Sequence, residues 1–528
     1  MPPARPTPDG GPPPLPLDAT VPRDAGIDAA AEADAGSPFA PEGPPRSIYL
    51  MMVDRFADGA PSPIADDPCT DPANPRSFHG GDLVGLREHL DYLEELGVDA
   101  VWVTPLTRQI EPGGAECGYH GYWADLAVPD DRAIEPRLGT DEDLRALIDA
   151  MHGRGMRLIL DMVVNHAGYD ARITRSHPEW FHPVEGCERL GDPEETCPLS
   201  YLPDFDQSVP EAADYLVAHG LGWLEAFDVD GVRMDTVKHV PLGFFADRWF
   251  PAVRAARPEL YVVGEVFDSG PYDTQRPYLD AGFDGLFDFR LRDALVGGLA
   301  QNGRLDEAAR EVAAAWDALG PERARHRSLF VENHDVPRFA SEIRASDDAE
   351  AARRLHLALA VILTTPGIPQ LYAGGELGMA GFWPDNRRDF PEWGFDASAR
   401  GPRDGYLGDP AVTFRLVRDL LALRRAAASL VDGDYIELWR PGGSGVPLYA
   451  FSRATETGRV IVTLSTGEVR ADVPLRDNPG LDPRSREAWI DGPLTDLLGR
   501  DASARAEVVD GRLSLDLPAG AIAVWAAP

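Results

Sequence analysis

The chain has 528 residues, of which 44% are hydrophobic, and its 87 acidic and 50 basic side chains give a formal net charge of −37. This length exceeds one compact core, so we expect two or three domains of a globular protein. The negative charge repels phosphate backbones and anionic membranes, which argues against nucleic-acid binding and favours a neutral or cationic partner, although surplus acid also serves solubility alone.

Residues 1–45 are rich in Pro, Ala, Asp and Gly and almost lack aromatic side chains. Such a segment buries too little apolar surface to fold, so we predict a disordered tether. It resembles the linker that follows a signal peptide or lipid anchor, although no apolar signal core lies within it. No apolar run is long enough to span a membrane. We therefore expect a secreted, cell-surface or periplasmic protein without a transmembrane segment.

From Ser47 onward, short apolar and β-branched runs alternate with amphipathic helical patterns. Eight runs are typical of buried parallel strands: SIYLMMV, AVWVTP, RLILDMVV, GVRMD, YVVGEV, DGLFDF, SLFVENHD and IPQLYAGGE. Helical patterns such as DLVGLREHLDYLEELG lie between them, with apolar residues three and four positions apart. The alternation predicts an α/β protein with a (β/α)8 TIM barrel over residues 46–166 and 210–428.

Two further regions differ from the barrel pattern. The stretch 167–209, after the third strand, is long and irregular, which indicates a small inserted domain. Residues 429–528 alternate strand patterns with turns and predict a C-terminal antiparallel β-sandwich.

Four cysteines, Cys69, Cys117, Cys187 and Cys197, allow three pairings. No CxxC pair occurs, which argues against a zinc ribbon. Cys187 and Cys197 bracket the polar segment CERLGDPEETC, which is typical of a disulfide-closed loop and suits an exported protein. The alternative is a set of four reduced, buried cysteines.

In a TIM barrel the reactive groups lie at the C-terminal ends of the strands. The third, fourth, fifth and seventh runs end in DMVVNH, GVRMD, GEVF and ENHD. These ends supply three carboxylates with cationic and imidazole neighbours, namely Asp235, Glu265, Asp335, Arg233, His166 and His334. A single one of them is commonly a solvated loop residue. Several buried carboxylates side by side are costly unless they serve a function.

These motifs carry a resemblance to the α-amylases of glycoside hydrolase family 13, over about Ser47 to Pro528. DMVVNH, GVRMDTVKH, GEVF and FVENHD are similar to the four signature regions of the family, in the same order. YLPDFD resembles its fifth region, and CGYHGYW resembles the aromatic motif after the second strand.

The resemblance implies Asp235 as nucleophile, Glu265 as general acid/base and Asp335 as the acid that holds the distorted sugar. A retaining glycosidase places its two carboxyls roughly 5–5.5 Å apart, so that one attacks while the other protonates the leaving oxygen. Glu265 must then stay protonated near neutral pH, and we expect crowding by Asp235 and Asp335 to promote this.

The resemblance also implies the side chains that bind the α-glucan substrate: His120, Tyr122, His166, Arg233, Lys238, His239, His334 and Arg387. Lys238 is the only lysine of the chain. Its compact ammonium, three positions after the nucleophile, would reach hydroxyls of the departing sugar. Many relatives carry NDPxNR after the eighth strand, where this chain has FWPDNRRD. Arg387 is kept, and Trp383 stands in place of the aspartate.

A structural Ca²⁺ is a further implication of the resemblance, where the third-strand loop meets the barrel. The matching ligands are Asn165, Asp204, the backbone carbonyl of His239, and Glu195 from the cysteine loop. Oxygen ligands from separate segments suit this hard cation. A second site would involve Asp58 and Asp82, although the asparagines that some relatives supply there are absent.

The leading hypothesis is a secreted, monomeric, retaining hydrolase of α-1,4-glucosidic bonds in starch, glycogen or malto-oligosaccharides. A second hypothesis keeps the fold and replaces water by a sugar acceptor, as in an α-glucanotransferase or cyclodextrin-directed enzyme. The segment DTVKHVP favours it slightly, because it resembles the corresponding segment in transferases of the family. A third is a non-catalytic glycan-binding protein, against which the intact acidic trio argues.

Overall fold

The structure is a computed structural model that describes residues 43–64, 66–110, 117–129, 132–440, 446–475, 489 and 491–526. Nearly all of the predicted tether, residues 1–42, lies outside the described residues. Among the helices of the described ranges, none has the length and apolar character that a membrane crossing requires.

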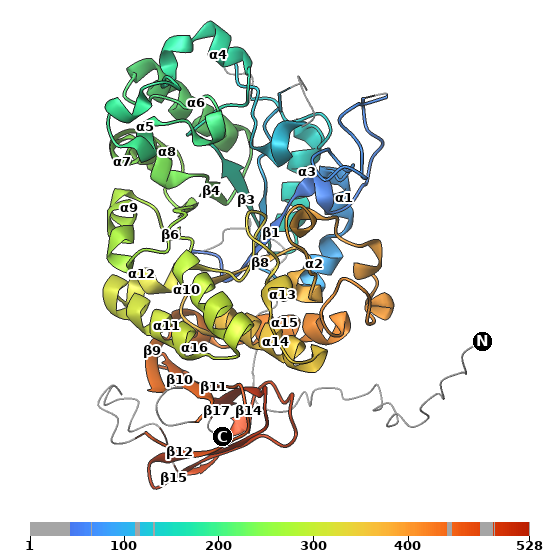
Figure 1. The fold of residues 1–528 in the computed structure, drawn as a ribbon, viewed down its shortest axis with the longest axis vertical. Coiled ribbons are helices and arrows are strands. Elements are labelled where there is room, and N and C mark those ends of the chain that lie inside the picture. Colours follow the sequence, from blue (N-terminus) through green and yellow to red (C-terminus); the bar gives the residue numbers. More distant parts are fainter. Residues whose placement is uncertain are drawn as a thin grey trace, which may run out of the picture. The chain divides into compact units, whose positions relative to one another are not determined.

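Eight parallel strands form the barrel, one within each predicted run (Figure 1). They are β1 (Ile48–Met51), β2 (Ala100–Val103), β3 (Arg157–Met162), β4 (Gly231–Met234), β5 (Tyr261–Gly264), β6 (Gly285–Leu286), β7 (Ser328–Leu329) and β8 (Ile368–Tyr372). Their order is β6-β5-β4-β3-β2-β1-β8-β7, and a parallel bridge between Phe287 and Ser328 joins the two ends. The predicted TIM barrel is confirmed.

Helices cover the outside of the barrel and connect its strands. Their bounds are α1 (Leu83–Glu88), α2 (Leu90–Leu96), α3 (Asp141–His152), α6 (Pro210–Ala226), α7 (Leu242–Phe244), α8 (Phe250–Ala256), α9 (Arg276–Ala281), α10 (Phe289–Ala294), α11 (Asp306–Leu319), α12 (Pro321–Arg325), α13 (Phe339–Glu342), α14 (Asp348–Thr364), α15 (Pro410–Ala426) and α16 (Ala428–Asp432). Helix α3 shows why they form where they do. Thr140 and Asp143 make a capping box at its start, and it buries Leu144, Leu147 and Met151 on one face.

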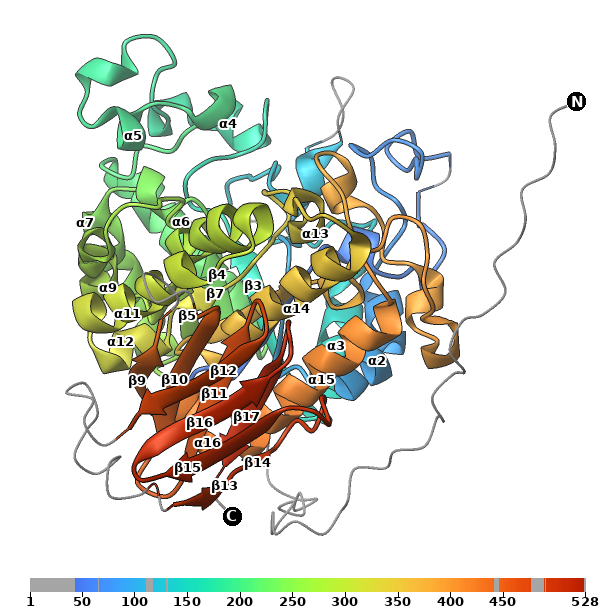
Figure 2. The same cartoon turned by 60° about the horizontal axis from the view of Figure 1, so that its bottom comes forward.

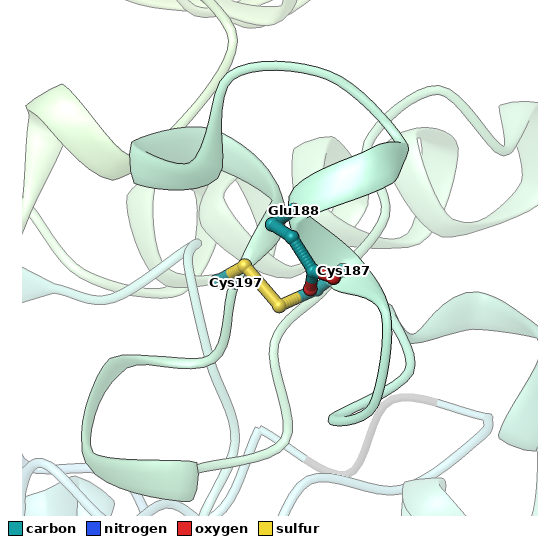
Figure 3. A group of neighbouring side chains, drawn as sticks. All are labelled: Cys187, Glu188 and Cys197. Atoms are coloured by element: carbon teal, nitrogen blue, oxygen red, sulfur yellow. A yellow bond between two sulfur atoms is a disulfide. The ribbon is translucent and has the colours of Figure 1, made fainter.

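The inserted stretch 167–209 contains only short helices, including α4 (Arg172–Ser176) and α5 (Pro193–Thr196). An antiparallel bridge between His166 and Asp204 ties its end back to the third strand's loop. The Cys187–Cys197 disulfide closes the loop that carries α5 (Figure 3). A short segment without its own large core is thus fixed by a crosslink.

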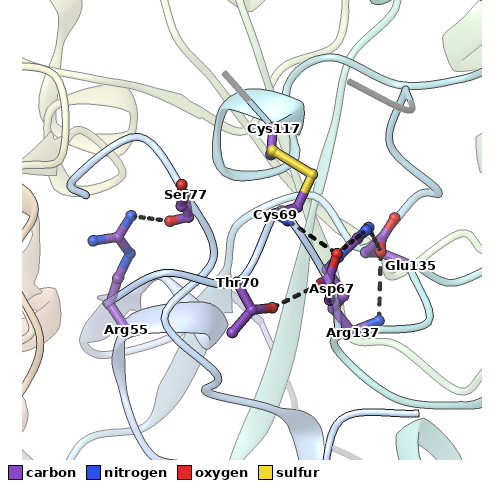
Figure 4. The surroundings of a disulfide bond; sticks show 8 residues. All are labelled: Arg55, Asp67, Cys69, Thr70, Ser77, Cys117, Glu135 and Arg137. Carbon is purple, nitrogen blue, oxygen red and sulfur yellow. Dashed lines mark hydrogen bonds and ion pairs between the residues drawn. A yellow bond between two sulfur atoms is a disulfide. The ribbon is translucent and has the colours of Figure 1, made fainter. Parts of the chain in front are cut away.

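The second disulfide joins Cys69 to Cys117, so both pairs are formed and the reduced-cysteine alternative is wrong. Figure 4 shows its surroundings. Arg137 bridges Asp67 and Glu135, with its Nε 2.7 Å from Asp67 Oδ2 and its Nη1 2.6 Å from Glu135 Oε1. The crosslink therefore lies beside an ion-pair network that joins the loop after β1 to the loop after β2.

Two antiparallel sheets follow the barrel and confirm the predicted sandwich (Figure 2). Their strands are β9 (Asp434–Trp439), β10 (Leu448–Ala454), β11 (Arg459–Ser465), β12 (Val469–Pro474), β13 (Gly492–Pro493), β14 (Thr495–Asp496), β15 (Arg505–Val509), β16 (Arg512–Leu517) and β17 (Ile522–Ala526). Leu448, Leu513 and Trp525 belong to their shared core. Fully buried Arg453 donates to the carbonyls of Thr364 and Gly433, which joins β10 to the end of α14.

Candidate active site

A cavity of about 560 Å³ opens at the C-terminal ends of the barrel strands. The three predicted catalytic acids line it, together with four of the predicted sugar ligands, Tyr122, His166, Lys238 and His239. Other aromatic side chains complete its wall: Tyr119 and Trp123 belong to the predicted aromatic motif CGYHGYW, whereas the sequence reasoning did not single out Tyr169 and Phe267. A concave site that combines aromatic faces with a few convergent acids is the type of site that binds sugars.

The barrel ladder positions two of the acids directly. Asp235 and Glu265 each follow a strand by one residue, and their backbone N–H groups donate to Met162 O and Met234 O, both at 2.9 Å. Pairing of β4 with β3 sets Arg233 beside Asp161. Consecutive strands of the barrel thus bring four charged side chains to one end.

Arg233 is fully buried and links the acids. Its Nη1 lies 2.6 Å from Asp235 Oδ1 and 2.9 Å from Asp161 Oδ1. Its Nη2 lies 2.7 Å from Glu265 Oε2, an ion pair without hydrogen-bond geometry. Because one rigid guanidinium contacts both members of the predicted catalytic pair, it fixes their carboxyls relative to each other.

The pKa of Glu265 is raised to about 8. Burial is the largest cause, Arg233 opposes it, and the neighbouring carboxylates Asp235 and Asp335 raise the pKa further. Glu265 is therefore protonated at neutral pH, as a general acid requires. The sequence-based expectation gave crowding as the cause, whereas desolvation contributes more in the structure.

Asp161 is a site residue whose role the sequence did not predict, although it is the first residue of the motif DMVVNH. Its Oδ2 accepts hydrogen bonds from Trp102 Nε1 at 3.0 Å and Tyr122 OH at 2.8 Å. Burial raises the pKa of Asp161 to about 7 against the opposing charge of Arg233. Asp161 therefore orients Tyr122 and Arg233 from beneath the cavity.

Asp335 is held by Arg387, whose Nη2 lies 2.8 Å from Asp335 Oδ1. Burial raises the pKa of Asp335, but His334, Arg387 and Arg233 outweigh it, so this pKa lies below its usual value. Burial lowers the pKa of His334 to about 4, so the ring is neutral at pH 7. Its Nε2 lies 2.7 Å from the hydroxyl of Tyr122.

One predicted sugar ligand, His120, and the substituted position Trp383 differ from the rest of the site. His120 is buried with its Nδ1 3.4 Å from Arg55 Nη2, and it is not among the residues that line the cavity. Burial and the charge of Arg55 hold the pKa of His120 well below its usual value. Trp383, in place of the family's aspartate, is half exposed with its ring 5.1 Å from the guanidinium of Arg76. The sugar contacts of His120 stay a prediction.

Lys238 and His239 lie in the short helix η6 (Val237–His239), which follows Thr236 in a left-handed conformation at φ 46°. Lys238 Nζ lies 2.5 Å from Glu194 Oε1, and His239 Nδ1 lies 2.8 Å from the carbonyl oxygen of Glu194. Glu194 was not predicted because its sequence context shows only a polar loop. A β-branched residue at positive φ is strained, and such strain is commonly found at functional sites.

The first predicted calcium site contains one buried oxygen atom that is available to bind a cation. Asn165 is fully buried, and its Oδ1 has no hydrogen-bond partner among the described residues. Asp204 is buried beside it, but its Oδ2 lies 2.8 Å from His182 Nδ1, a partner that the sequence did not indicate. An orphaned amide oxygen near a buried carboxylate fits a hard cation. Glu195 has no described contact with either residue.

The second predicted calcium site fits less well. Asp58 and Asp82 line a cavity of about 370 Å³, and burial together with Asp82 raises the pKa of Asp58. The carboxylate of Asp82 already accepts the backbone N–H groups of Gly85 at 2.7 Å and Ala60 at 2.8 Å. This geometry favours Asp82 as the N-cap of α1 over a role as metal ligand.

Comparisons with known proteins agree with this geometry. A sequence model of the alpha-amylase catalytic domain matches residues 50–183 and 197–399. A cyclomaltodextrin glucanotransferase of Klebsiella oxytoca is 27% identical over 474 residues, which cover 80% of this chain and 70% of that protein. The crystal structure of an Anoxybacillus α-amylase has a TM-score of 0.75 at 27% identity, covering 91% of this chain and 97% of that one. A cyclomaltodextrin glucanotransferase with a three-domain ABC distribution also has a TM-score of 0.75, at 25% identity, covering 92% and 99%.

Proposed function

Because the chain belongs to the α-amylase family of glycosidases and transglycosylases, we propose that it is a retaining hydrolase of α-1,4-glucosidic bonds in starch, glycogen or malto-oligosaccharides. The observation that supports this most strongly is the buried Arg233, which contacts both Asp235 and Glu265 at the floor of the cavity. Double displacement requires two neighbouring carboxyls, one that attacks and one that is protonated, and Arg233 holds two such groups beside each other.

In the proposed mechanism Asp235 attacks the anomeric carbon while Glu265 gives its proton to the leaving oxygen, so that a covalent glycosyl-enzyme forms as the glucosidic bond breaks. Glu265, now ionised, then takes a proton from water, which attacks the same carbon and releases Asp235. Asp335, held by Arg387, accepts hydrogen bonds from ring hydroxyls. Those bonds stabilise the reaction where they strengthen as the oxocarbenium-like transition state forms.

We further propose that the protein binds a structural Ca²⁺ through Asn165, Asp204 and the carbonyl of His239. When bound, the ion would supply positive charge and hold the inserted stretch against the barrel. The orphaned Asn165 Oδ1 supports this proposal. Export from the cytoplasm is also proposed, and the two disulfides support it because such bonds persist in oxidising compartments.

A second candidate function is glucan transfer, in which a sugar hydroxyl replaces water in the second step. Two of the similar proteins are named cyclomaltodextrin glucanotransferases, which favours this alternative. Lys238 and His239 line the same cavity as Glu265, and an acceptor sugar would bind against them. Hydrolysis and transfer share the same first step, so the acids have the same roles in both.

The test is to incubate the protein with soluble starch and with maltoheptaose and to chromatograph the products. We expect short linear oligomers from both substrates, with the α-configuration of the newly formed ends seen by NMR. Cyclic products from either substrate, or products longer than the substrate in the maltoheptaose incubation, would favour the transferase over the hydrolase. Unchanged substrates would contradict both functions and leave the glycan-binding alternative. Asp235→Asn protein serves as the control for contaminating activity.

A further inference from the structure

The loop closed by the Cys187–Cys197 disulfide makes polar contacts with the wall of the active site through Glu194. Glu194 in α5 binds Lys238 with its side chain, at 2.5 Å, and His239 with its backbone carbonyl, at 2.8 Å. Both partners lie in η6 and line the cavity that contains the acids. Glu194 is not itself one of the residues that line the cavity, but it holds two of them.

The position of Glu194 depends on the crosslink. The disulfide joins two residues only ten positions apart, and α5 lies in the second half of the loop that it closes (Figure 3). Thr196 Oγ1 donates to the carbonyl of Cys187 at 2.9 Å, and the side chain of Asp192 caps α5 at Glu194 N. A helix of one turn is not stable by itself in water, so these constraints maintain it.

Stability does not account for the ion pair well. The side chain of Glu194 is 50% exposed and that of Lys238 is 22% exposed. Pairs this accessible to solvent contribute little to the free energy of unfolding. The pair does, however, fix the direction of a long flexible side chain that otherwise samples many rotamers. Its effect is therefore on where the ammonium group lies at the cavity.

The identity of the cation agrees with a positioning role. All other residues of the lysine and arginine class in this chain are arginines, and the exception stands at the wall beside the predicted nucleophile. An ammonium is a compact donor with three N–H bonds and no fixed plane, so it can bind one carboxylate and still donate to sugar hydroxyls. A broad guanidinium facing Glu194 would favour a bidentate pair and leave fewer donors for a ligand.

From these contacts we propose that Glu194 is a positioning residue, which holds Lys238 toward the hydroxyls of the leaving-group part of an α-glucan, and that the Cys187–Cys197 disulfide keeps Glu194 in place. The inference rests on the proposed function for its substrate. The claim that Glu194 fixes the position of Lys238 does not depend on the proposed function. Replacing Glu194 should leave the rate of bond cleavage itself unchanged, because the described contacts of Glu194 include neither Asp235 nor Glu265.

The kinetic test compares Glu194→Gln, Lys238→Gln and the double variant on maltotetraose and on starch. Glu194→Gln keeps the backbone carbonyl that binds His239 and removes only the charge. We expect KM for maltotetraose to rise about 3- to 10-fold and the cleavage position to shift, with kcat within about twofold. The double variant should match Lys238→Gln alone, because Glu194 acts through Lys238. Starch should be affected less, since it makes more contacts.

The matched control is Glu188→Gln, which makes the same change in the same loop at an exposed residue whose described partner is Arg189. It should leave both KM values and the cleavage position unchanged. An equal effect of Glu188→Gln and Glu194→Gln would overturn the inference, because it would show a general response to loop charge. Additive effects in the double variant would overturn it as well.

A second measurement does not depend on activity. Lys238 carries the only ε-amine, so acetylation by an N-hydroxysuccinimidyl ester can be followed at one peptide by mass spectrometry. We expect Lys238 to react several-fold faster in Glu194→Gln and in Cys187→Ser/Cys197→Ser than in wild type or Glu188→Gln, because the amine leaves its ion pair.

Equal labelling rates in all four proteins would overturn the placement of Lys238 by Glu194, even if the wild type cleaves glucans. Faster labelling with unchanged KM and products would overturn the substrate role. If labelling changes but wild type leaves maltotetraose and starch intact, the proposed function and that role both fail, while the placement holds.

Discussion

Replacing Glu265 by Gln should abolish hydrolysis and at the same time make the fold more stable at neutral and alkaline pH. The folded pKa of about 8 compares with an ordinary value of 4.5. Below pH about 4.5 the carboxyl is protonated in both the folded and unfolded states, so it has no differential effect. Between about 4.5 and 8 the unfolded state ionises and the folded state does not, so the free energy of unfolding falls by about 1.4 kcal/mol per pH unit.

The loss levels off above pH about 8 and amounts to at most about 5 kcal/mol, because relaxation around the site reduces it. The amide introduced by Glu265→Gln does not ionise, so the variant lacks this loss.

The protonated fraction of Glu265 also sets the rate of hydrolysis. At pH 7 a group with a pKa of about 8 is about 90% protonated, whereas an ordinary glutamate is less than about 1% protonated. Activity of the wild type should therefore decline as pH rises through about 8.

The assay is thermal unfolding of wild type, Glu265→Gln and the exposed control Glu188→Gln at pH 5 and pH 8, with maltoheptaose hydrolysis measured over the same range. We expect the melting temperature of Glu265→Gln to exceed that of wild type by several degrees more at pH 8 than at pH 5. The control should show no such difference. An identical shift of Glu265→Gln at both pH values would refute the argument that Glu265 is held protonated by burial.

The remaining predictions concern the nucleophile and the metal. Asp235→Asn should lower kcat on maltoheptaose by at least about 10³-fold without lowering the melting temperature, because the carboxylate of Asp235 serves chemistry more than packing. Retention of more than a few per cent of kcat in a clean preparation would contradict the nucleophile assignment. Chelation should lower the melting temperature of wild type, since a ligand present at 100 times its Kd stabilises the native state by about 2.7 kcal/mol. Asp204→Asn protein should respond less to the chelator, and an unchanged wild-type melting curve in excess chelator would count against the calcium site.

The barrel and its acids could be predicted because their signals are local. Each strand is a short apolar run with turn residues around it, and the C-terminal ends of parallel strands meet at one face. Asp235 and Glu265 follow their strands by one residue, so knowing the strands was enough to bring them together. The same reasoning leads to the confirmed sandwich, whose alternating pattern is equally local.

Asp161 and Glu194 could not be predicted in this way. The partners of Asp161 come from three different segments of the barrel, and only the folded register shows that Trp102 and Tyr122 share its oxygen. Glu194 belongs to a polar loop without hydrophobic periodicity. Its direction is set by a disulfide and by packing against η6. The hydrogen bond of His182 to Asp204 was missed for the same reason, because the two residues are 22 positions apart in an irregular segment.

The charge count around Arg233 explains how the site retains a proton. One guanidinium faces Asp161, Asp235 and Glu265, so three ionised carboxylates would leave two negative charges uncompensated within the buried cluster. Burial makes such an excess costly, and the cluster lowers that cost by keeping protons. The pKa of Glu265, about 8, identifies it as the group that keeps its proton at pH 7, whereas the pKa of Asp161, about 7, leaves that carboxyl about half ionised there. Asp235 has the shortest contact with Arg233, at 2.6 Å, which agrees with its proposed role as nucleophile. One buried arginine shared by three acids thus places the proposed nucleophile and the proposed proton donor in different electrostatic surroundings, although both are carboxylic acids.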